Sequence, residues 1–420
     1  MPASRQVKQH GFAIYISCVI VTHSVDEQTQ WHLLPKAPGD YLSAAGTLPL
    51  IAQLLYNRNI SLNKVASFLS RDQITQGNPF LLPDMQKAVT RIYKAILSKE
   101  KIVIYGDFDV DGVTATATLT EGLSWLGAQV GTYIPDRFDE GHGLNSDAIS
   151  KLNQQGFNLI ITVDCGITDN EQVKQARKMG MDMIITDHHI PSTDLPPAVA
   201  AVDAKRQDSR YPFPDLAGVG VAFKLLQALF HKDSRERKLV ELLDMVALGT
   251  VADMVPLIDE NRYLVQRGLE VLNNTNRIGL QDMIKTSGLQ MGKLDAESIS
   301  WDLGPRLNAA GRMGTANTSY ELLISTSPDE AHLLTLELEQ RNIERQKLSR
   351  EILARASDRI QEQSEALLLI DGDEDYPVGI IGLVAGRLVN KFYKPAIMLT
   401  LGKELCRGSS RSIAEFNMVQ

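Results

Sequence analysis

The sequence gathers carboxylate and imidazole side chains in three short segments. The segments are YGDFDVDG, VDCG and TDHH, which contain Asp107, Asp109, Asp111, Asp164, Asp187, His188 and His189. Carboxylates this close together repel one another unless a cation binds them. Carboxylates combined with one or two imidazoles, and without a thiolate, suit Mn²⁺ or Mg²⁺ better than structural zinc. Several bridging carboxylates favour two ions, a pair that would activate a water and stabilise both oxygens of an in-line phosphoryl displacement.

Other interpretations compete for each segment. The pattern D-x-D-x-D-G also opens an EF-hand calcium loop, which needs a Glu at its twelfth position and a helix on each side. Counted from Asp107, the twelfth residue is Thr118, and a strand pattern precedes the loop, so the EF-hand is excluded. An acidic surface turn remains the alternative for the first segment. An Asp after a strand often caps the following helix, and an Asp beside a His often only forms a hydrogen bond with it. The prediction of a metal site therefore rests on the recurrence of such residues at the ends of three strands.

Each segment follows an apolar run that predicts a buried strand, at 101–105, 159–163 and 183–186. Further strands are predicted at 129–134 and 199–202, with helical patterns between most of them, including one from Gly112 onward. Strands that alternate with helices predict an α/β fold around a parallel sheet with both faces covered. Loops at the carboxyl ends of such strands are where a site forms.

The rest of the chain is mostly helical. Helices are predicted at 48–56, 60–68 and 85–98, and over much of 216–325, where Asp253 in LGTVADMVPL adds a carboxylate to an apolar stretch. An acid there needs a partner or a metal. Residues 328–363 read as one long helix whose sparse apolar positions and charged faces indicate a solvated connection between two domains. A second α/β unit opens at 366–370.

Composition is that of a globular protein, with 44% hydrophobic residues, 22% charged residues and a net charge of -8, which excludes a uniformly basic coat but not a local basic cleft. Three distant cysteines, Cys18, Cys165 and Cys406, indicate neither a disulfide framework nor a thiolate zinc site, so we expect a reducing, cytoplasmic location. Residues 11–25 are apolar but short for a membrane span and lack a cleavage pattern, so an N-terminal strand or extension is favoured over a signal peptide, and no membrane is expected.

The motifs YGDFDVDG, VDCG, TDHH and VADMVPL, in this order, resemble the DHH phosphoesterase superfamily. GPRLNAAGRMGTA, the long helix and GIIGLVAGRL followed by RGSSRSI are similar to its bacterial RecJ branch. The resemblance starts near Trp31 and implies a parallel-sheet DHH domain with a helical extension, a long connecting helix and part of a second α/β, DHH-associated domain. The implied boundaries are an extension at 1–30, the DHH domain with its helices at 31–325, the helix at 326–363 and the incomplete domain at 364–420.

The resemblance also implies roles for individual residues. The implied metal ligands are Asp109, Asp111, Asp164, His188 and Asp253. Asp107 and Asp187 would bind the metals or support the ligands, and His189 would lie near the scissile phosphate. The implied contacts to DNA phosphates, including the 5′ end, are Arg137, Arg306, Asn308, Arg312, Ser409 and Arg411, with surface salt bridges or a solvated turn as the alternatives. Asp136 replaces the family's Asn before Arg137, and we expect the acid to weaken phosphate contact there.

RecJ-like proteins are 5′→3′ exonucleases on single-stranded DNA, so the resemblance implies such an enzyme in DNA repair and recombination. It would use Mn²⁺ or Mg²⁺, with two ions expected, act as a monomer, and have a single-strand-binding protein or a helicase as further partners. The alternatives are a DHH phosphodiesterase on short RNA or cyclic dinucleotides, a pyrophosphatase of the same superfamily, and a weakly active scaffold. RecJ-like chains continue past FNM into a Gly-Gly-His segment and a nucleic-acid-binding barrel, and we therefore expect this chain to be C-terminally truncated.

Overall fold

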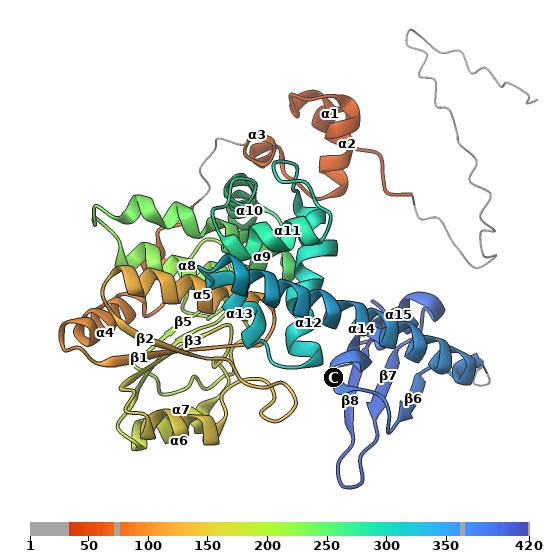
Figure 1. Ribbon diagram of the computed structural model, residues 1–420. Helices are drawn as coiled ribbons and strands as arrows, with labels where there is room; N and C mark the ends of the chain where they lie inside the picture. The colour runs from red at the N-terminus through yellow and green to blue at the C-terminus, as the bar shows by residue number, and fades with distance from the viewer. Residues whose placement is uncertain (1–32, 71–75, 362–365, 419–420) are drawn as a thin grey trace, which may run out of the picture. The chain divides into compact units, whose positions relative to one another are not determined.

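The computed structural model describes residues 33–70, 76–361 and 366–418 (Figure 1). The apolar segment at 11–25, Cys18 and the predicted extension at 1–30 lie outside these ranges. The chain divides into two compact units, Met1–Ala66 and Ser67–Gln420. The described part of the first unit contains α1 (Gly39–Ala44), α2 (Pro49–Asn57) and the start of α3 (Leu62–Leu69). In this unit the Tyr41 hydroxyl donates a hydrogen bond to the Ile60 carbonyl, which ties α1 to the segment after α2.

The second unit is built on a five-stranded sheet in the order β2-β1-β3-β4-β5, in which every pair is parallel. The strands are β1 (Lys101–Gly106), β2 (Gln129–Tyr133), β3 (Leu159–Val163), β4 (Asp182–Thr186) and β5 (Ala200–Val202). All five predicted strands are present, and the predicted parallel α/β fold is confirmed. The pairs Gly106↔Val163, Val163↔Thr186 and Thr186↔Val202 place four strand ends at one level.

Helices cover both faces of this sheet because the strands carry apolar side chains on both faces. Ile102 and Ile104 of β1 belong to a core with α4, α5 and α8, whereas Val103 and Tyr105 pack with α6 and α7 (Figure 1). Burial on both faces is typical of parallel sheets. The covering helices are α4 (Met85–Leu97), which follows the 3₁₀ turn Pro79–Leu81, then α5 (Val110–Trp125), α6 (Ser146–Gln154), α7 (Asn170–Lys178) and α8 (Gly218–Leu229).

A helical layer continues the core beyond α8. It consists of the 3₁₀ segment Glu236–Leu242, α9 (Leu243–Ala252), α10 (Asp259–Leu272), α11 (Ile278–Thr286), the π-helical segment Ser298–Leu303, α12 (Gly304–Met313) and α13 (Asn317–Ile324). Helix α9 is buried along almost its whole length, between α5, α8 and α10. Asp253 follows its last residue and therefore caps the helix instead of lying within it.

The predicted long helix is α14 (Pro328–Gln361), which contacts α11, α12 and α13 as well as α15 and β6. It is less solvated than its sequence indicated, because a face with the small polar residues Thr335, Asn342 and Ser349 is buried. Beyond it lies a sheet in the order β6-β7-β8, with β7 parallel to β6 and antiparallel to β8. Its elements are β6 (Leu369–Asp373), α15 (Val378–Phe392), β7 (Ala396–Thr400) and β8 (Arg407–Arg411).

Candidate metal centre

The carboxyl end of β1 supplies the first carboxylates of the site. Asp109 caps the start of α5, where its Oδ1 accepts hydrogen bonds from the backbone N–H groups of Asp111 (2.9 Å) and Gly112 (3.2 Å). A capping Asp fits this position because the first turn of a helix has free N–H groups. Asp107, just before it, is buried, and its Oδ1 has no hydrogen-bond partner among the described residues.

Asp111 is buried in the first turn of α5 and faces the start of α8. Its Oδ2 accepts a hydrogen bond from the Gly218 N–H (2.6 Å) and its Oδ1 one from the Val219 N–H (2.8 Å). The N-terminus of a helix favours an anion through these amides and its dipole. Residue 218 must be Gly, because a Cβ would lie 2.6 Å from the Asp164 Cβ and 2.9 Å from the Asp111 Oδ2. The close approach of the α8 N-terminus therefore holds Asp111 by hydrogen bonds and packs against Asp164.

The ends of β3 and β4 bring the remaining groups. Asp164 leaves β3 with a φ of 61°, a left-handed conformation that Asp tolerates better than most residues. Asp187 leaves β4 and is fully engaged by protein groups. Its Oδ1 accepts from the backbone of His188 (2.7 Å) and from the His189 Nδ1 (2.8 Å), and its Oδ2 accepts from the Ile167 N–H (2.9 Å). Asp187 therefore orients the two histidines instead of offering a free oxygen.

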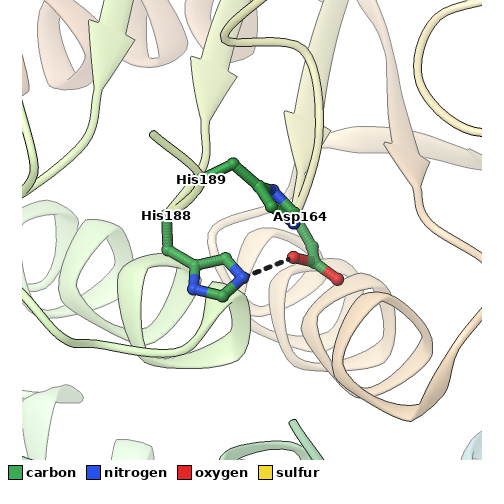
Figure 2. A group of neighbouring side chains, drawn as sticks. All are labelled: Asp164, His188 and His189. Atoms are coloured by element: carbon green, nitrogen blue, oxygen red, sulfur yellow. Dashed lines mark ion pairs between the residues drawn. The ribbon is translucent and has the colours of Figure 1, made fainter. Parts of the chain in front are cut away.

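His188 approaches three of the acids, and Figure 2 shows it beside Asp164 and His189. Its Nε2 is 3.0 Å from the Asp164 Oδ1, 3.7 Å from the Asp253 Oδ2 and 3.8 Å from the Asp111 Oδ2. None of these approaches has hydrogen-bond geometry, and the His188 Nε2, Asp164 Oδ1 and Asp253 Oδ2 are buried without a partner in the described chain. Buried polar atoms without partners are costly and call for an explanation such as a bound ion. The donor set therefore fits a divalent cation.

Three overlapping groups of side chains have ligand atoms within 4.8 Å of one another. They are Asp111 with His188 and Asp253, Asp107 with Asp109 and Asp164, and Asp164 with His188 and His189. Asp164 and His188 each belong to two groups.

The protonation preferences of the two histidines differ. Burial is the main cause that lowers the pKa of His188 to about 4, so its imidazole is neutral near pH 7 and has a lone pair for a metal. The hydrogen bond to Asp187 is the main cause that raises the pKa of His189 to about 9, so that ring carries a proton at neutral pH. Burial acts against the ionisation of Asp187, but hydrogen bonds from His189 and from backbone amides lower its pKa overall.

The pKa values of the acids beside His188 change in the opposite direction from that of Asp187. Burial, followed by repulsion from neighbouring carboxylates, raises the pKa of Asp111 and of Asp164 well above the ordinary value. The same two causes raise the pKa of Asp253 to about 6. A cation bound among these acids would reverse the preference by stabilising the charged forms.

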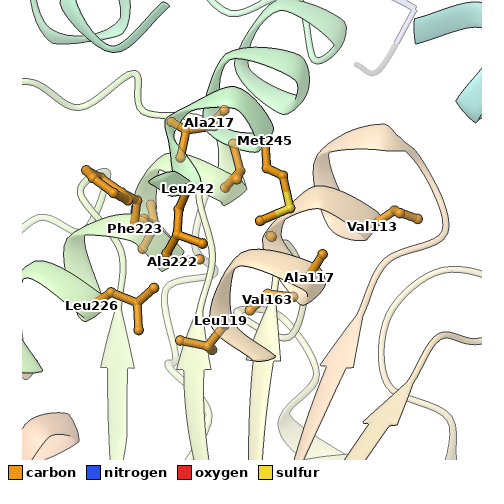
Figure 3. Close-up of a cluster of buried hydrophobic side chains, with 14 of the residues drawn as sticks. Val113, Ala117, Leu119, Val163, Ala217, Ala222, Phe223, Leu226, Leu242 and Met245 are labelled. Carbon is orange, nitrogen blue, oxygen red and sulfur yellow. The ribbon is translucent and has the colours of Figure 1, made fainter. Parts of the chain in front are cut away.

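Apolar packing directly beneath the site holds the helices that carry it (Figure 3). Val113, Ala117 and Leu119 of α5 belong to the same buried cluster as Val163 of β3 and side chains from α8 and α9. The side chains of α8 and α9 in this core include Ala222, Phe223, Leu226 and Met245. Close-packed protein interiors resist displacement of the helices and strands that form them, so this core sets the spacing of the acids.

The predicted phosphate contacts separate into two sets. Arg137 stacks on the Phe108 ring at 4.0 Å and donates a hydrogen bond to the Gly311 carbonyl (3.0 Å), while Arg312 donates to the Gly379 carbonyl (3.3 Å). Arg411, with Ser409, lies on β8 against Gly382 of α15. Within the described ranges no carboxylate forms an ion pair with Arg137, Arg312 or Arg411. Burial, followed by repulsion from Arg137 and Arg345, lowers the pKa of Arg312 to about 10, so it stays charged at neutral pH.

Arg306 and Asn308 make contacts within the protein. Arg306 forms an ion pair with Glu339 of α14 (2.5 Å) and donates to the Asp302 carbonyl (2.9 Å), which is the salt-bridge alternative. The Asn308 Oδ1 accepts from the Val110 N–H (3.3 Å) and so supports the first turn of α5. The Asp136 carboxylate also makes a contact within the protein. Its Oδ1 accepts a hydrogen bond from the backbone N–H of Phe138 (2.7 Å) in a turn.

Sequence reasoning missed three charged residues near these groups. Asp203 follows β5 in the same way that the other acids follow their strands, and it is fully buried with its Oδ2 unpartnered in the described chain. Burial raises its pKa to about 7. The strand-then-Asp pattern at 199–203 was a signal that could have found it. Arg345 of α14 adds charge beside Arg312 and lies in no motif, whereas Arg387 of α15, which acts on Arg345, lies in GIIGLVAGRL but was not singled out.

Comparison with known proteins adds the following. A model of the DHH family, N-terminal domain, matches residues 101–250. The chain is 43% identical over 376 residues to the single-stranded-DNA-specific exonuclease RecJ of Bacillus subtilis, a match that covers 89% of this chain and 47% of that protein. The crystal structure of RecJ in complex with Mn²⁺ from Thermus thermophilus is similar with a TM-score of 0.77 and 29% identity, over 92% of this chain and 55% of that one.

A crystal structure of exonuclease RecJ bound to manganese matches with a TM-score of 0.70 and 32% identity, over 80% of this chain and 84% of that one. The chain thus spans about half the length of the Bacillus and Thermus relatives. None of the helices in the described ranges is long and apolar enough to cross a membrane.

Proposed function

This chain belongs to the RecJ branch of the DHH family, as its motifs predicted, and we propose that it is a metal-dependent exonuclease that degrades single-stranded DNA from the 5′ end. One observation carries the proposal. A buried cluster of acids and His188 has ligand atoms without hydrogen-bond partners in the described chain. A group of arginines that includes Arg137 and Arg312 lies next to this cluster, and these arginines form no ion pair with a carboxylate in the described chain. A cation site beside an anion site is what hydrolysis of a phosphodiester needs.

The residues proposed to hold the metal are Asp109, Asp111, Asp164, His188 and Asp253, with Asp107 beside them. We propose two ions, because Asp164 and His188 each belong to two of the three possible ligand groups. When bound, Mn²⁺ or Mg²⁺ would supply an activated water and neutralise the charge that builds on the phosphate. The protein contributes the fixed spacing of the ligands and a neutral imidazole at His188.

His189 has a different role from His188. Its ring is exposed, and its Nδ1 is held by Asp187, so its other nitrogen is free to face the substrate. A protonated imidazole at this place donates a hydrogen bond to a phosphate oxygen as negative charge develops, which is an electrostatic contribution to catalysis. Asp187 is a positioning residue in this scheme, since both of its carboxylate oxygens accept hydrogen bonds from protein groups.

The arginine group supports the proposed polarity. Arg137, Arg312 and Arg411 come from three different elements and are close enough to act on the same charge, and Ser409 adds a hydroxyl. Guanidinium groups bind phosphate as rigid forks, so this group is suited to a terminal 5′ phosphate. The proposed partners are single-stranded DNA and, beyond it, a single-strand-binding protein or a helicase, for a monomeric enzyme in the cytoplasm.

The proposal is tested with one oligonucleotide labelled at either end, incubated with the protein and Mn²⁺. A 5′ label should appear at once as mononucleotide, while a 3′ label should shorten one nucleotide at a time. Duplex of the same sequence should be spared. Early release of the 3′ label, or equal loss of duplex and single strand, would overturn the proposal, and Asp164→Ala serves as the inactive control.

A further inference from the structure

The carboxyl edge of the first sheet carries a cation at each of its two ends. In the strand order β2-β1-β3-β4-β5, the segment after β2 contains Arg137 and the segment after β5 contains Lys205. The acids and histidines follow the three strands between them. The lysine was not singled out by any motif, and the function proposed above does not use it.

The sheet register places Lys205 beside the histidines. Val202 is the last residue of β5 and pairs with Thr186 of β4, and the Val202 carbonyl accepts a hydrogen bond from the Asp187 N–H (3.1 Å). Residues 203–205 therefore leave the sheet next to the segment that contains His188 and His189. The buried Asp203 Oδ1 accepts from the Lys205 N–H (2.7 Å), which fixes the turn.

The surroundings leave the Lys205 ammonium group available. The next residue, Arg206, is tied down by ion pairs with Asp84 (2.7 Å) and Asp208 (2.8 Å), so the segment is anchored. Lys205 is half-buried, and in the described chain no carboxylate lies within ion-pair distance of it. Lys205 therefore differs from an ordinary solvated lysine. Its backbone is already ordered, and its ammonium group has no carboxylate partner in the described chain.

We propose that Lys205 binds the backbone phosphate on the 3′ side of the scissile bond, so that the strand is held by cations on both sides of the metal centre. This inference rests on the proposed function. A strand whose 5′ phosphate lies at Arg137 and Arg312 crosses the ends of β1, β3 and β4 and then meets the segment after β5. Lys205 lies about two strand spacings from the end of β3, roughly 10 Å, which suits a neighbouring phosphate better than the scissile one.

The test compares Lys205→Gln and Lys205→Arg with the wild-type chain on 5′-phosphorylated thymidine dinucleotide, trinucleotide and a 12-mer in Mn²⁺. The dinucleotide has no phosphate beyond the scissile one, whereas the longer two do. Lys205→Gln should lower kcat/KM on the trinucleotide and 12-mer by roughly 10-fold through KM, as expected for a charged hydrogen bond, and leave the dinucleotide unchanged. Lys205→Arg should restore most of the loss, and Lys151→Gln on the exposed face of α6 is the matched control.

Two further readouts exclude a merely structural role. The slope of log KM against log salt for the 12-mer should fall by about 0.7 in Lys205→Gln, the value for one phosphate contact to a single strand. Mn²⁺ affinity should be unchanged in both variants. Equal losses on all three substrates, or a loss that Lys205→Arg does not restore, would overturn the inference.

The two proposals fail in different ways. If the wild-type chain releases no nucleotide from any of the three substrates, the proposed exonuclease function is wrong and this inference is wrong with it. If the wild type degrades all three and Lys205→Gln equals it on the trinucleotide, only the inference about Lys205 is wrong.

Discussion

An acidic cluster and a basic cluster of side chains meet at the carboxyl edge of the first sheet. The acidic cluster is assembled by neighbouring strands of one sheet and is held from behind by the N-terminus of α8. The basic cluster draws Arg137 from the segment after β2, Arg312 from α12 and Arg411 from β8. The difference teaches that the proposed cation site needs only the first sheet, its helices and the end of α9, whereas the proposed anion site also requires the second sheet and α15.

The largest effect is expected from the acidic cluster. Asp164→Asn should lower kcat by roughly 10²-fold to 10³-fold or more, because it removes a charged ligand that belongs to two of the three ligand groups. The same change removes one of several repelling buried carboxylates, so the metal-free variant should melt on the order of 2 °C above the metal-free wild type. Steady-state kinetics in Mn²⁺ and thermal melts in a chelator measure the two effects. A variant that keeps wild-type kcat would remove Asp164 from the site.

A smaller effect is expected from the basic cluster. Arg312→Gln should reduce kcat/KM for a 5′-phosphorylated strand by about 10-fold to 100-fold, the range for hydrogen bonds to a charged group, and reduce it less for a 5′-hydroxyl strand. Mn²⁺ binding should not change, since Arg312 contacts no acid of the metal centre. The measurement is kcat/KM on the two strands side by side. An equal loss on both would mean that Arg312 does not recognise the terminal phosphate.

The Asp187 and His189 pair predicts a dependence on pH. The pKa of His189 is raised to about 9 by Asp187, so the stabilisation from this pair is fully present below the unfolded value near 6.5 and is lost as the pH rises through about 9. Melting temperatures of the metal-free protein should therefore fall between pH 7 and pH 9.5. His189→Gln should flatten that slope, and a slope unchanged in the variant would assign it to other groups.

The smallest effect separates two arginines of the same motif. Arg306 is paired with Glu339, whereas Arg312 has no acidic partner in the described ranges. Glu339→Gln breaks a partly exposed ion pair, whose contribution is typically about 1 kcal/mol or less, so it should change DNA affinity by no more than roughly fivefold. Fluorescence anisotropy with a labelled single strand in Ca²⁺ measures it. A large gain in affinity would show that Glu339 holds back a phosphate contact at Arg306.

The same two clusters mark what the sequence could predict. Asp107, Asp109 and Asp111 share one segment, and Asp164 and Asp187 each follow a readable strand, so local patterns were enough to place these five acids at one edge. Asp253 was recognised as a buried acid, but its position after the last turn of α9 depends on where that helix ends. Asp203 repeated the pattern on the shortest strand and was overlooked.

The basic cluster could not be derived from local pattern. Arg345 of α14 looks like an ordinary residue on a charged helix face, and only tertiary packing brings its charge toward Arg312. For Arg306 the motif predicted a phosphate contact, while the competing ion pair came from a residue 33 positions away. Long-range partners of this kind are invisible to a reading based on spacing along the chain.

The central claim is that the buried acids and His188 form a binding site for divalent cations. The most direct test is equilibrium dialysis of the metal-free chain against Mn²⁺, followed by metal analysis of the wild type and of Asp164→Asn. We predict two ions per wild-type chain and a loss of tight binding in the variant, because Asp164 belongs to two of the three ligand groups. A wild-type chain that retains no Mn²⁺, or a variant that retains as much as the wild type, would contradict the claim.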